Sequence, residues 1–142
     1  MERYFKKFDV MVNFAQQIAK LSTCTRLQVG CVVVNHALTH VLAMGYNGPA
    51  RGRPNNSCTG AAGSCGCIHA EANALIKLKE TKHMCIITTH SPCEHCEGLI
   101  LNSNIERVYY FIEYRKSNVN QFIRIGDHYE DLERWYARSR AK

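Results

Sequence analysis

Apolar residues recur along this chain with two different spacings, one typical of helices and one typical of strands. Over residues 4–21 they return every three or four positions, which predicts a first amphipathic helix. Residues 29–35 and 41–46 are short runs rich in β-branched and other apolar side chains, and they predict two neighbouring strands joined by a turn over 36–40. The chain therefore begins with a helix followed by a hairpin.

The second half of the chain alternates between the two patterns. Residues 69–79 and 93–103 predict helices, and residues 84–89 and 107–112 predict strands. Such alternation is typical of right-handed βαβ units with a partly parallel sheet. Residues 118–125 and 129–137 both predict helices. Residues 47–67 have no periodicity, and a loop of this length inside a compact domain is usually functional.

Composition indicates an ordinary globular domain. The chain has 142 residues, of which 46% are hydrophobic and 21% charged, and we expect one domain over 1–142. Its longest apolar runs are too short for a membrane span or a signal peptide, so we expect an intracellular, cytoplasmic protein. Eight cysteines in a reducing compartment indicate metal binding or catalysis rather than disulfides.

The formal net charge is +6. A solvated basic surface explains this value, and so does attraction of an anionic substrate such as a nucleotide or a nucleic acid. Charge alone leaves both explanations open.

Two short motifs carry the chemistry of the chain. The first joins His69 and Glu71, and the second, Pro-Cys-Glu-His-Cys, contains Cys93 and Cys96. One imidazole and two thiolates form a ligand set that zinc takes while its fourth tetrahedral position holds water. With the glutamate and the proline, the spacing matches the H-x-E…P-C-x-x-C signature of zinc deaminases that act on nucleobases. We therefore predict a catalytic zinc bound by His69, Cys93 and Cys96.

These ligands fall at the predicted N-terminal ends of helices. Backbone N–H groups and the helix dipole there favour a thiolate over a thiol. Zinc lowers the pKa of a bound water, and Glu71 can take the released proton and return it to the ring and the leaving amine. The alternative is a zinc that only staples the fold, with Glu71 as a solvated helix residue. That zinc would close its fourth position with a protein ligand.

Four segments make the chain similar to a known family: residues 22–30 (STCTRLQVG), 45–49 (GYNGP), 68–74 (IHAEANA) and 91–96 (SPCEHC). With them it resembles the cytidine and deoxycytidylate deaminase superfamily, and most closely the deoxycytidylate (dCMP) deaminases. The resemblance implies a three-layer α/β/α fold with a mixed five-stranded sheet. It also implies hydrolysis of dCMP to dUMP in pyrimidine nucleotide metabolism, and a homo-oligomer.

The resemblance also implies substrate contacts. Asn47 would hydrogen-bond the sugar, and the backbone around Ala70 and Ser91 would hold the pyrimidine edge. Arg26 and Tyr114 stand where the family contacts the nucleotide, and we assign them to the phosphate. Without the resemblance, the arginine is a surface charge, the tyrosine an aromatic at the core edge, and the asparagine a turn residue.

Four cysteines lie ahead of the first motif, in a polar break or in the long loop: Cys24, Cys58, Cys65 and Cys67. Some dCMP deaminases carry a second, structural zinc in this region, and the chain resembles them at the first two of these positions. We hypothesise that the four thiolates form a closed tetrahedral site that orders loop 47–67. The alternatives are free thiols, or a site that uses only some of them. Cys31 and Cys85 lie on predicted strands and should be small buried hydrophobes.

The sequence thus predicts a zinc hydrolase, a dCMP deaminase, with one catalytic zinc and a second structural zinc. The same chemistry on another substrate is the first alternative: cytidine, a guanine- or pterin-like ring, or a base in tRNA or single-stranded DNA. The basic tail over 134–142 keeps nucleic acid among these substrates. A zinc-stapled binding module without catalysis is the second alternative. The partner we expect is a small nucleotide, rather than a nucleic acid or a membrane.

Overall fold

The structure is a computed structural model that describes residues 1–61, 64–79 and 82–140. Its helices and strands follow one another in this order: α1 Glu2–Ala19, β1 Gly30–Asn35, β2 Val41–Tyr46, α2 Ala70–Leu75, β3 Met84–His90, α3 Glu94–Asn102, β4 Ile105–Ile112, β5 Phe122–Arg124 and α4 Tyr129–Arg140. Within the described residues, no helix combines the length and the apolar character that a membrane crossing requires.

The five strands form one mixed sheet in the order β2-β1-β3-β4-β5. β1 pairs antiparallel with β2 and with β3, whereas the β3–β4 and β4–β5 pairs are parallel. The predicted mixed five-stranded sheet is therefore confirmed. The parallel strands β3 and β4 both end at the same edge of the sheet, and α3 begins directly after β3.

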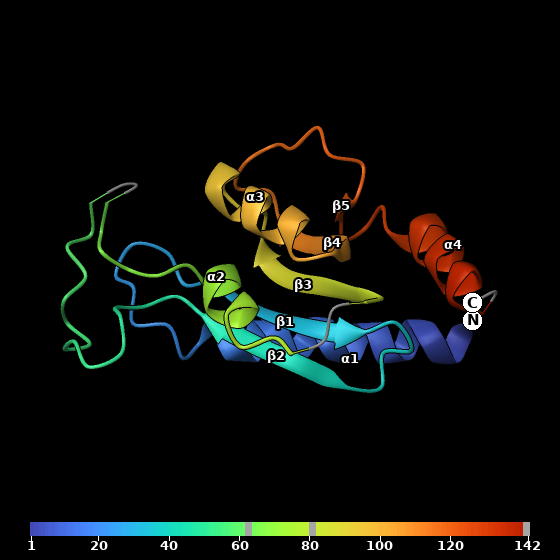
Figure 1. The fold of residues 1–142 in the computed structure, drawn as a ribbon, viewed down its shortest axis with the longest axis horizontal. Coiled ribbons are helices and arrows are strands. Elements are labelled where there is room, and N and C mark those ends of the chain that lie inside the picture. Colours follow the sequence, from blue (N-terminus) through green and yellow to red (C-terminus); the bar gives the residue numbers. More distant parts are fainter. Residues whose placement is uncertain (62–63, 80–81, 141–142) are drawn as a thin grey trace.

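Two apolar clusters cover the two faces of the sheet. In Figure 1, α1 runs behind β1 and β2, and α2 lies in front of them. Alternate residues of β1 belong to the two clusters. Cys31 and Val33 belong to the cluster that contains residues of α2 and α3, and Val32 and Val34 to the cluster that contains residues of α1 and α4. Side chains of neighbouring strand positions point to opposite faces, so a central strand must be apolar on both. These clusters confirm the three-layer α/β/α arrangement and the burial of Cys31 and Cys85.

One predicted element is wrong. Residues 118–125 were expected to form a helix, but Phe122–Arg124 is the edge strand β5, paired parallel with β4 through Val108, Tyr109 and Tyr110. Apolar residues at 119, 122, 123 and 125 fit a helical spacing. Pairing with β4 nevertheless satisfies the hydrogen-bonding groups of the backbone and buries Phe122 in the core. The helix predicted over 69–79 is also shorter, because α2 ends at Leu75.

Two glycines let helices lie directly on the strands. A Cβ atom at Gly45 in β2 would stand 2.1 Å from the Ala70 carbonyl oxygen and 2.8 Å from the Ala74 nitrogen, both backbone atoms of α2. A Cβ atom at Gly30 in β1 would stand 2.3 Å from the Ala19 nitrogen of α1. Real Cβ atoms do not approach backbone so closely, so each glycine fixes how near its helix can lie.

We predict that Gly45→Ala destabilises the protein, because α2 would have to move away from β2. Overpacking of this kind costs typically 1–3 kcal/mol, and a clash with backbone lies at about the upper end of that range. Gly98→Ala is the matched control, since nothing lies within 4 Å of its added methyl group. In the interior of α3 this change should stabilise by about 0.5–1 kcal/mol. Urea unfolding of both variants measures the difference, and equal stabilities would contradict the prediction.

Candidate active site

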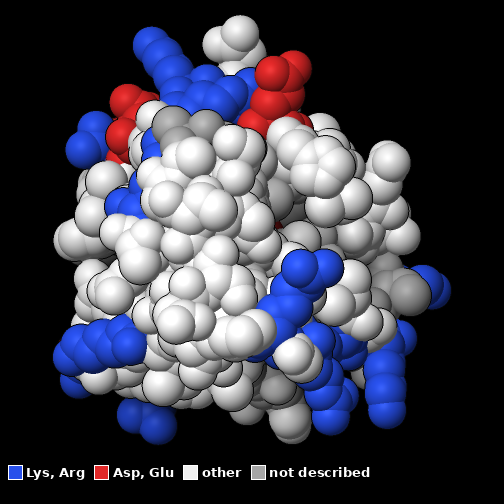
Figure 2. All heavy atoms as spheres, turned by 90° about the vertical axis from the view of Figure 1, so that its left-hand side faces the viewer, with Lys and Arg blue, Asp and Glu red and all other residues white. Residues whose placement is uncertain are grey.

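A pocket of about 190 Å³ opens where β3 and β4 end and where α2 and α3 begin. The crevice outside the carboxyl ends of parallel strands is the usual place for a ligand in an α/β sheet. Every site residue predicted from the sequence lines this pocket, except Cys58 and Cys96. Figure 2 shows a hollow in the middle of this end of the molecule, with Lys and Arg side chains gathered below it; Asp and Glu side chains lie beside further Lys and Arg at the top of the view.

Three predicted metal ligands converge at one side of the pocket. His69 is the N-cap of α2 and Cys93 the N-cap of α3. His69 Nδ1 lies 3.3 Å from Cys93 Sγ and 3.3 Å from Cys96 Sγ. A nitrogen and a sulfur on one tetrahedral zinc stand about 3.6 Å apart, so this geometry fits zinc with little adjustment.

Burial of Cys96 opposes the thiolate form that the start of a helix favours. A thiolate was expected at this helix start, but burial, followed by the negative charges of Glu71 and Cys93, raises the pKa of the Cys96 thiol. A divalent cation between the three donors would supply the positive charge that the thiolate needs.

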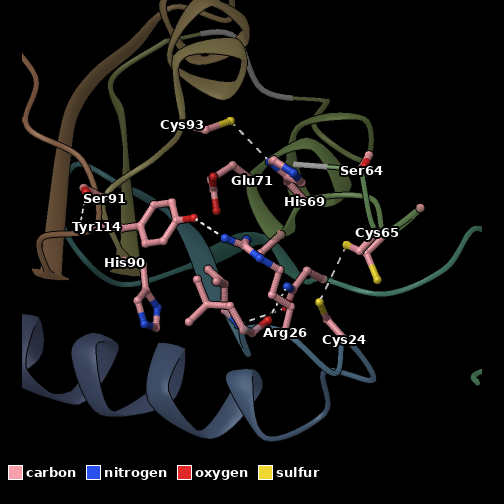
Figure 3. A pocket seen from close by; sticks show the side chains of 16 residues that line it. Cys24, Arg26, Ser64, Cys65, His69, Glu71, His90, Ser91, Cys93 and Tyr114 are labelled. Atoms are coloured by element: carbon pink, nitrogen blue, oxygen red, sulfur yellow. Dashed lines mark hydrogen bonds between the residues drawn. The ribbon is translucent and has the colours of Figure 1, made fainter. Parts of the chain in front are cut away.

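Glu71, the second residue of α2, is buried in the wall of the pocket. In Figure 3 its carboxyl points into the pocket, between the His69 side and the Tyr114 side. Burial raises the pKa of this carboxyl to about 7, and hydrogen bonds from the Glu71 backbone N–H and from the Cys96 thiol only partly offset that rise. A carboxyl with this pKa can both accept and donate a proton near neutral pH.

The four remaining cysteines outside the strands form a second cluster, and their sulfur atoms lie within 4.8 Å of one another: Cys24, Cys58, Cys65 and Cys67. The sulfur of Cys24 is 3.8 Å from that of Cys58 and 4.0 Å from that of Cys65. Two thiolates on one zinc stand about 3.8 Å apart, whereas disulfide sulfurs would be about 2.0 Å apart. All eight cysteines are free thiols.

Thr25 favours a thiolate in this second cluster. Its N–H and its hydroxyl both donate to the sulfur of Cys58, and these bonds lower the pKa of Cys58 to about 6. Zinc binds the thiolate form. The chemistry of the donors therefore fits zinc at this cluster as well.

Arg26 and Tyr114 meet at the mouth of the pocket, although they are far apart in the sequence. The Arg26 guanidinium donates a hydrogen bond of 2.9 Å to the Tyr114 hydroxyl, and it lies 5.9 Å from the centre of the ring. Both side chains are exposed. Since Tyr114 accepts this bond, its own hydroxyl hydrogen and the other guanidinium N–H groups can donate to a ligand. A ligand with several oxygen acceptors, such as a phosphate, would suit these donors.

Asn47 has a structural role that the sequence did not indicate. Its side-chain oxygen accepts from the Val29 N–H at 2.9 Å and contacts the Ser22 hydroxyl at 2.6 Å, and its amide group donates to the Leu27 carbonyl at 2.6 Å. The residue is buried. One amide hydrogen is left for a ligand, because the NH₂ group carries two.

The Ser91 side chain is also used within the fold. Its hydroxyl oxygen accepts from the N–H groups of Tyr114 and Arg115, each at 2.8 Å, and its hydrogen goes to the Arg115 carbonyl at 2.9 Å. The Ser91 N–H donates to the Ile112 carbonyl, so only the Ser91 carbonyl remains for a base. Ser91 thus fixes Tyr114 relative to the zinc motif.

Two apolar lining residues, Leu27 and Val29, were missed in the sequence. They follow Arg26 in one of the segments that carry the family resemblance. The sequence indicates them only through their spacing, because side chains two residues apart in an extended segment lie on the same side. They give the pocket an apolar wall, which suits a flat ring.

Comparison with known families gives one match over most of the chain. A family model described as the cytidine and deoxycytidylate deaminase zinc-binding region matches residues 6–112. Together with the Cys and His clusters, this match supports zinc as the metal of the chain.

Relatives of known name agree with that match. The chain is 31% identical over 118 residues to a deoxycytidylate deaminase of Schizosaccharomyces pombe, a stretch that covers 72% of this chain and 36% of that protein. It is 33% identical over 119 residues to a deoxycytidylate deaminase of Mycobacterium phage D29, covering 72% of this chain and 91% of that protein. The chain therefore spans about a third of the yeast protein and most of the phage one.

A solved structure confirms the fold. The crystal structure of the dCMP deaminase from cyanophage S-TIM5 in complex with dCMP and dUMP aligns with a TM-score of 0.67 and 32% sequence identity. The alignment covers 89% of this chain and 90% of that one. The expected cytidine-deaminase-like fold is thus present.

Proposed function

Because the chain belongs to the cytidine and deoxycytidylate deaminase family, we propose that it hydrolyses dCMP to dUMP and ammonia. One observation carries the proposal: the buried carboxyl of Glu71 lies beside the His69, Cys93 and Cys96 donors in a pocket with Arg26 at its mouth. This arrangement can remove an amine from a ring and bind an anion in the same site. The named activity of the phage relatives, which have about the length of this chain, supports the same reading.

Hydrolytic deamination needs an activated water, a proton for the ring nitrogen next to the amine, and a proton for the leaving amine. Zinc bound by His69, Cys93 and Cys96 would lower the pKa of a water to near neutrality. Glu71 would accept a proton from a water and donate it to the ring nitrogen. After the new C–O bond has formed, the same carboxyl would take the proton of the new hydroxyl and pass it to the amine; the C–N bond would then break and ammonia would leave.

The rest of the pocket would orient the nucleotide. Arg26 and the Tyr114 hydroxyl would hold phosphate oxygens, and the remaining amide hydrogen of Asn47 would reach the sugar. The Ala70 N–H belongs to the first turn of α2 and has no partner within the helix. It would bind the pyrimidine edge together with the Ser91 carbonyl.

We further propose that the second cysteine cluster holds a structural zinc. The spacing of its sulfurs and the lowered pKa of Cys58 support a closed site of four thiolates. Burial raises the pKa of the Cys67 thiol in the same cluster, and the charge of a bound cation would offset that rise. Three of the cysteines, all but Cys58, also line the substrate pocket. A zinc there would order loop 47–67 along one wall of that pocket.

The decisive test of the function is Glu71→Gln. This change keeps the size of the side chain and removes its ability to accept a proton, so kcat for dCMP should fall by about 10²–10⁴-fold. Zinc content and melting temperature should stay at the wild-type values. Ammonia release is measured on dCMP, dCTP, CMP, deoxycytidine and dAMP side by side.

Two further variants in this assay test the proposed recognition of the phosphate. Arg26→Ala should raise KM for dCMP and leave deoxycytidine unaffected, whereas Arg51→Ala, an exposed arginine outside the pocket lining, should change neither. Full activity of Glu71→Gln would contradict the proposed mechanism. If zinc-loaded wild-type protein released no ammonia from any free nucleotide, the proposed substrate would be contradicted. Deamination of single-stranded DNA or tRNA would then identify a nucleic acid as the substrate.

For the structural zinc we predict that Cys58→Ser lowers the metal content by about one zinc ion per chain. Cys85→Ala is the control, because this buried cysteine belongs to neither cluster and should leave the metal content unchanged. Elemental analysis of the purified proteins gives the ratio. A wild-type content near one zinc per chain would overturn the second site.

We also propose that the chain forms a homo-oligomer through the β2 edge of the sheet. Val41, Met44 and Tyr46 are 38–40% exposed on this edge strand, and Ile76, the C-cap of the helix α2 that packs on β2, is 77% exposed. Ile76→Lys should shift the sedimentation coefficient to that of a smaller species, and Val10→Lys on α1 should not. A wild-type monomer at all concentrations would contradict this proposal.

A further inference from the structure

A third group of metal-ligating side chains lies at the other end of the sheet. His36 follows β1, His83 precedes β3, and Glu106 is the second residue of β4. One ligand atom from each lies within 4.8 Å of the other two. In Figure 1 this end of the strands lies beside α4, away from the helix starts that form the pocket.

The distances already approach those of a bound ion. His83 Nδ1 is 3.2 Å from a Glu106 oxygen. Nitrogen and oxygen ligands at about 2.1 Å from one tetrahedral ion stand about 3.4 Å apart. The third donor, His36, therefore needs to close by no more than roughly 1.5 Å. His36 is buried and the other two are half-buried, so an ion here would be largely shielded from solvent.

Trp135 of α4 supplies the outer interactions that metal ligands usually have. His36 Nε2 contacts the Trp135 carbonyl oxygen, an acceptor only, so this nitrogen carries the ring hydrogen. In a neutral imidazole Nδ1 then holds the lone pair. The indole N–H of Trp135 donates to the other Glu106 oxygen at 2.9 Å. A ligating histidine that donates to a carbonyl, and a ligating carboxylate that accepts a hydrogen bond, are the typical second layer of a metal site.

We propose that His36, His83 and Glu106 bind a divalent transition-metal ion of the zinc class. Two imidazoles and one carboxylate suit zinc, cobalt or nickel, whereas magnesium and calcium prefer oxygen ligands. The ion would join the β1–β2 turn and the starts of β3 and β4, and through Trp135 it would join them to α4. This site is independent of the proposed deaminase activity.

Trp135 is the single tryptophan of the chain and reports on this site directly. Its ring stacks on His36 at 3.9 Å between centroids, so a paramagnetic ion on His36 quenches its fluorescence at short range. Cobalt(II) is the probe, added to untagged protein whose cysteine sites are already filled with zinc. We expect saturable quenching with about one Co²⁺ bound per chain.

Two variants and one control make the test specific. His83→Ala and Glu106→Gln should abolish the saturable quenching; the glutamine keeps an acceptor for the indole N–H. His40→Ala removes an exposed histidine of the same turn and should behave as wild type. Absence of quenching in wild type, or equal quenching in all four proteins, would overturn the proposal and leave an ion pair between His83 and Glu106. The experiment measures tryptophan fluorescence and not deaminase activity. A negative result would therefore contradict the proposed metal site and leave the proposed deaminase function untouched.

Discussion

The close contact between α2 and β2 is the constraint on which the site depends. α2 has only six residues, and a helix of that length is not stable by itself in water. It is held in place by packing on the sheet, where Gly45 leaves room for the Ala70 carbonyl and the Ala74 nitrogen. His69 is the N-cap of this helix and Glu71 its second residue, so the depth at which α2 lies also sets the positions of the proposed metal donor and of the proposed proton-transferring carboxyl.

The opposite side of the site depends on β3 in the same way. β3 lies between β1 and β4, and its last residues lead directly into the N-cap Cys93 of α3. Because α2 and α3 start at one edge of the sheet, donors that are distant in sequence meet without any long side chain. The Ser91 hydroxyl then ties the segment after β4 to this helix start, and so sets the place of Tyr114.

Local patterns predicted most of the fold and most of the polar residues that the structure brings together around the pocket. The strands over 29–46 and the two zinc motifs depend on neighbouring residues, so spacing alone was enough to find them. β5 was missed because its pairing partner is β4, and its own apolar spacing also fits a helix. The group of His36, His83 and Glu106 was missed for the same reason, since only the register of β1, β3 and β4 brings these three residues together.

The hydrogen bonds of Asn47 link the proposed sugar contact to the four-cysteine cluster. Asn47 contacts the Ser22 hydroxyl, and the oxygen of Ser22 accepts from the Cys24 N–H at 3.2 Å. Thr25, the next residue, donates to Cys58, and Arg26 follows it at the mouth of the pocket. The segment that carries Arg26, the proposed phosphate ligand, is therefore held on one side by Asn47, the proposed sugar ligand, and on the other by the cysteine cluster. Ordering this segment before the nucleotide arrives lowers the entropy that binding would otherwise cost. A second metal far from the reacting atoms would thus act on KM rather than on the chemical step.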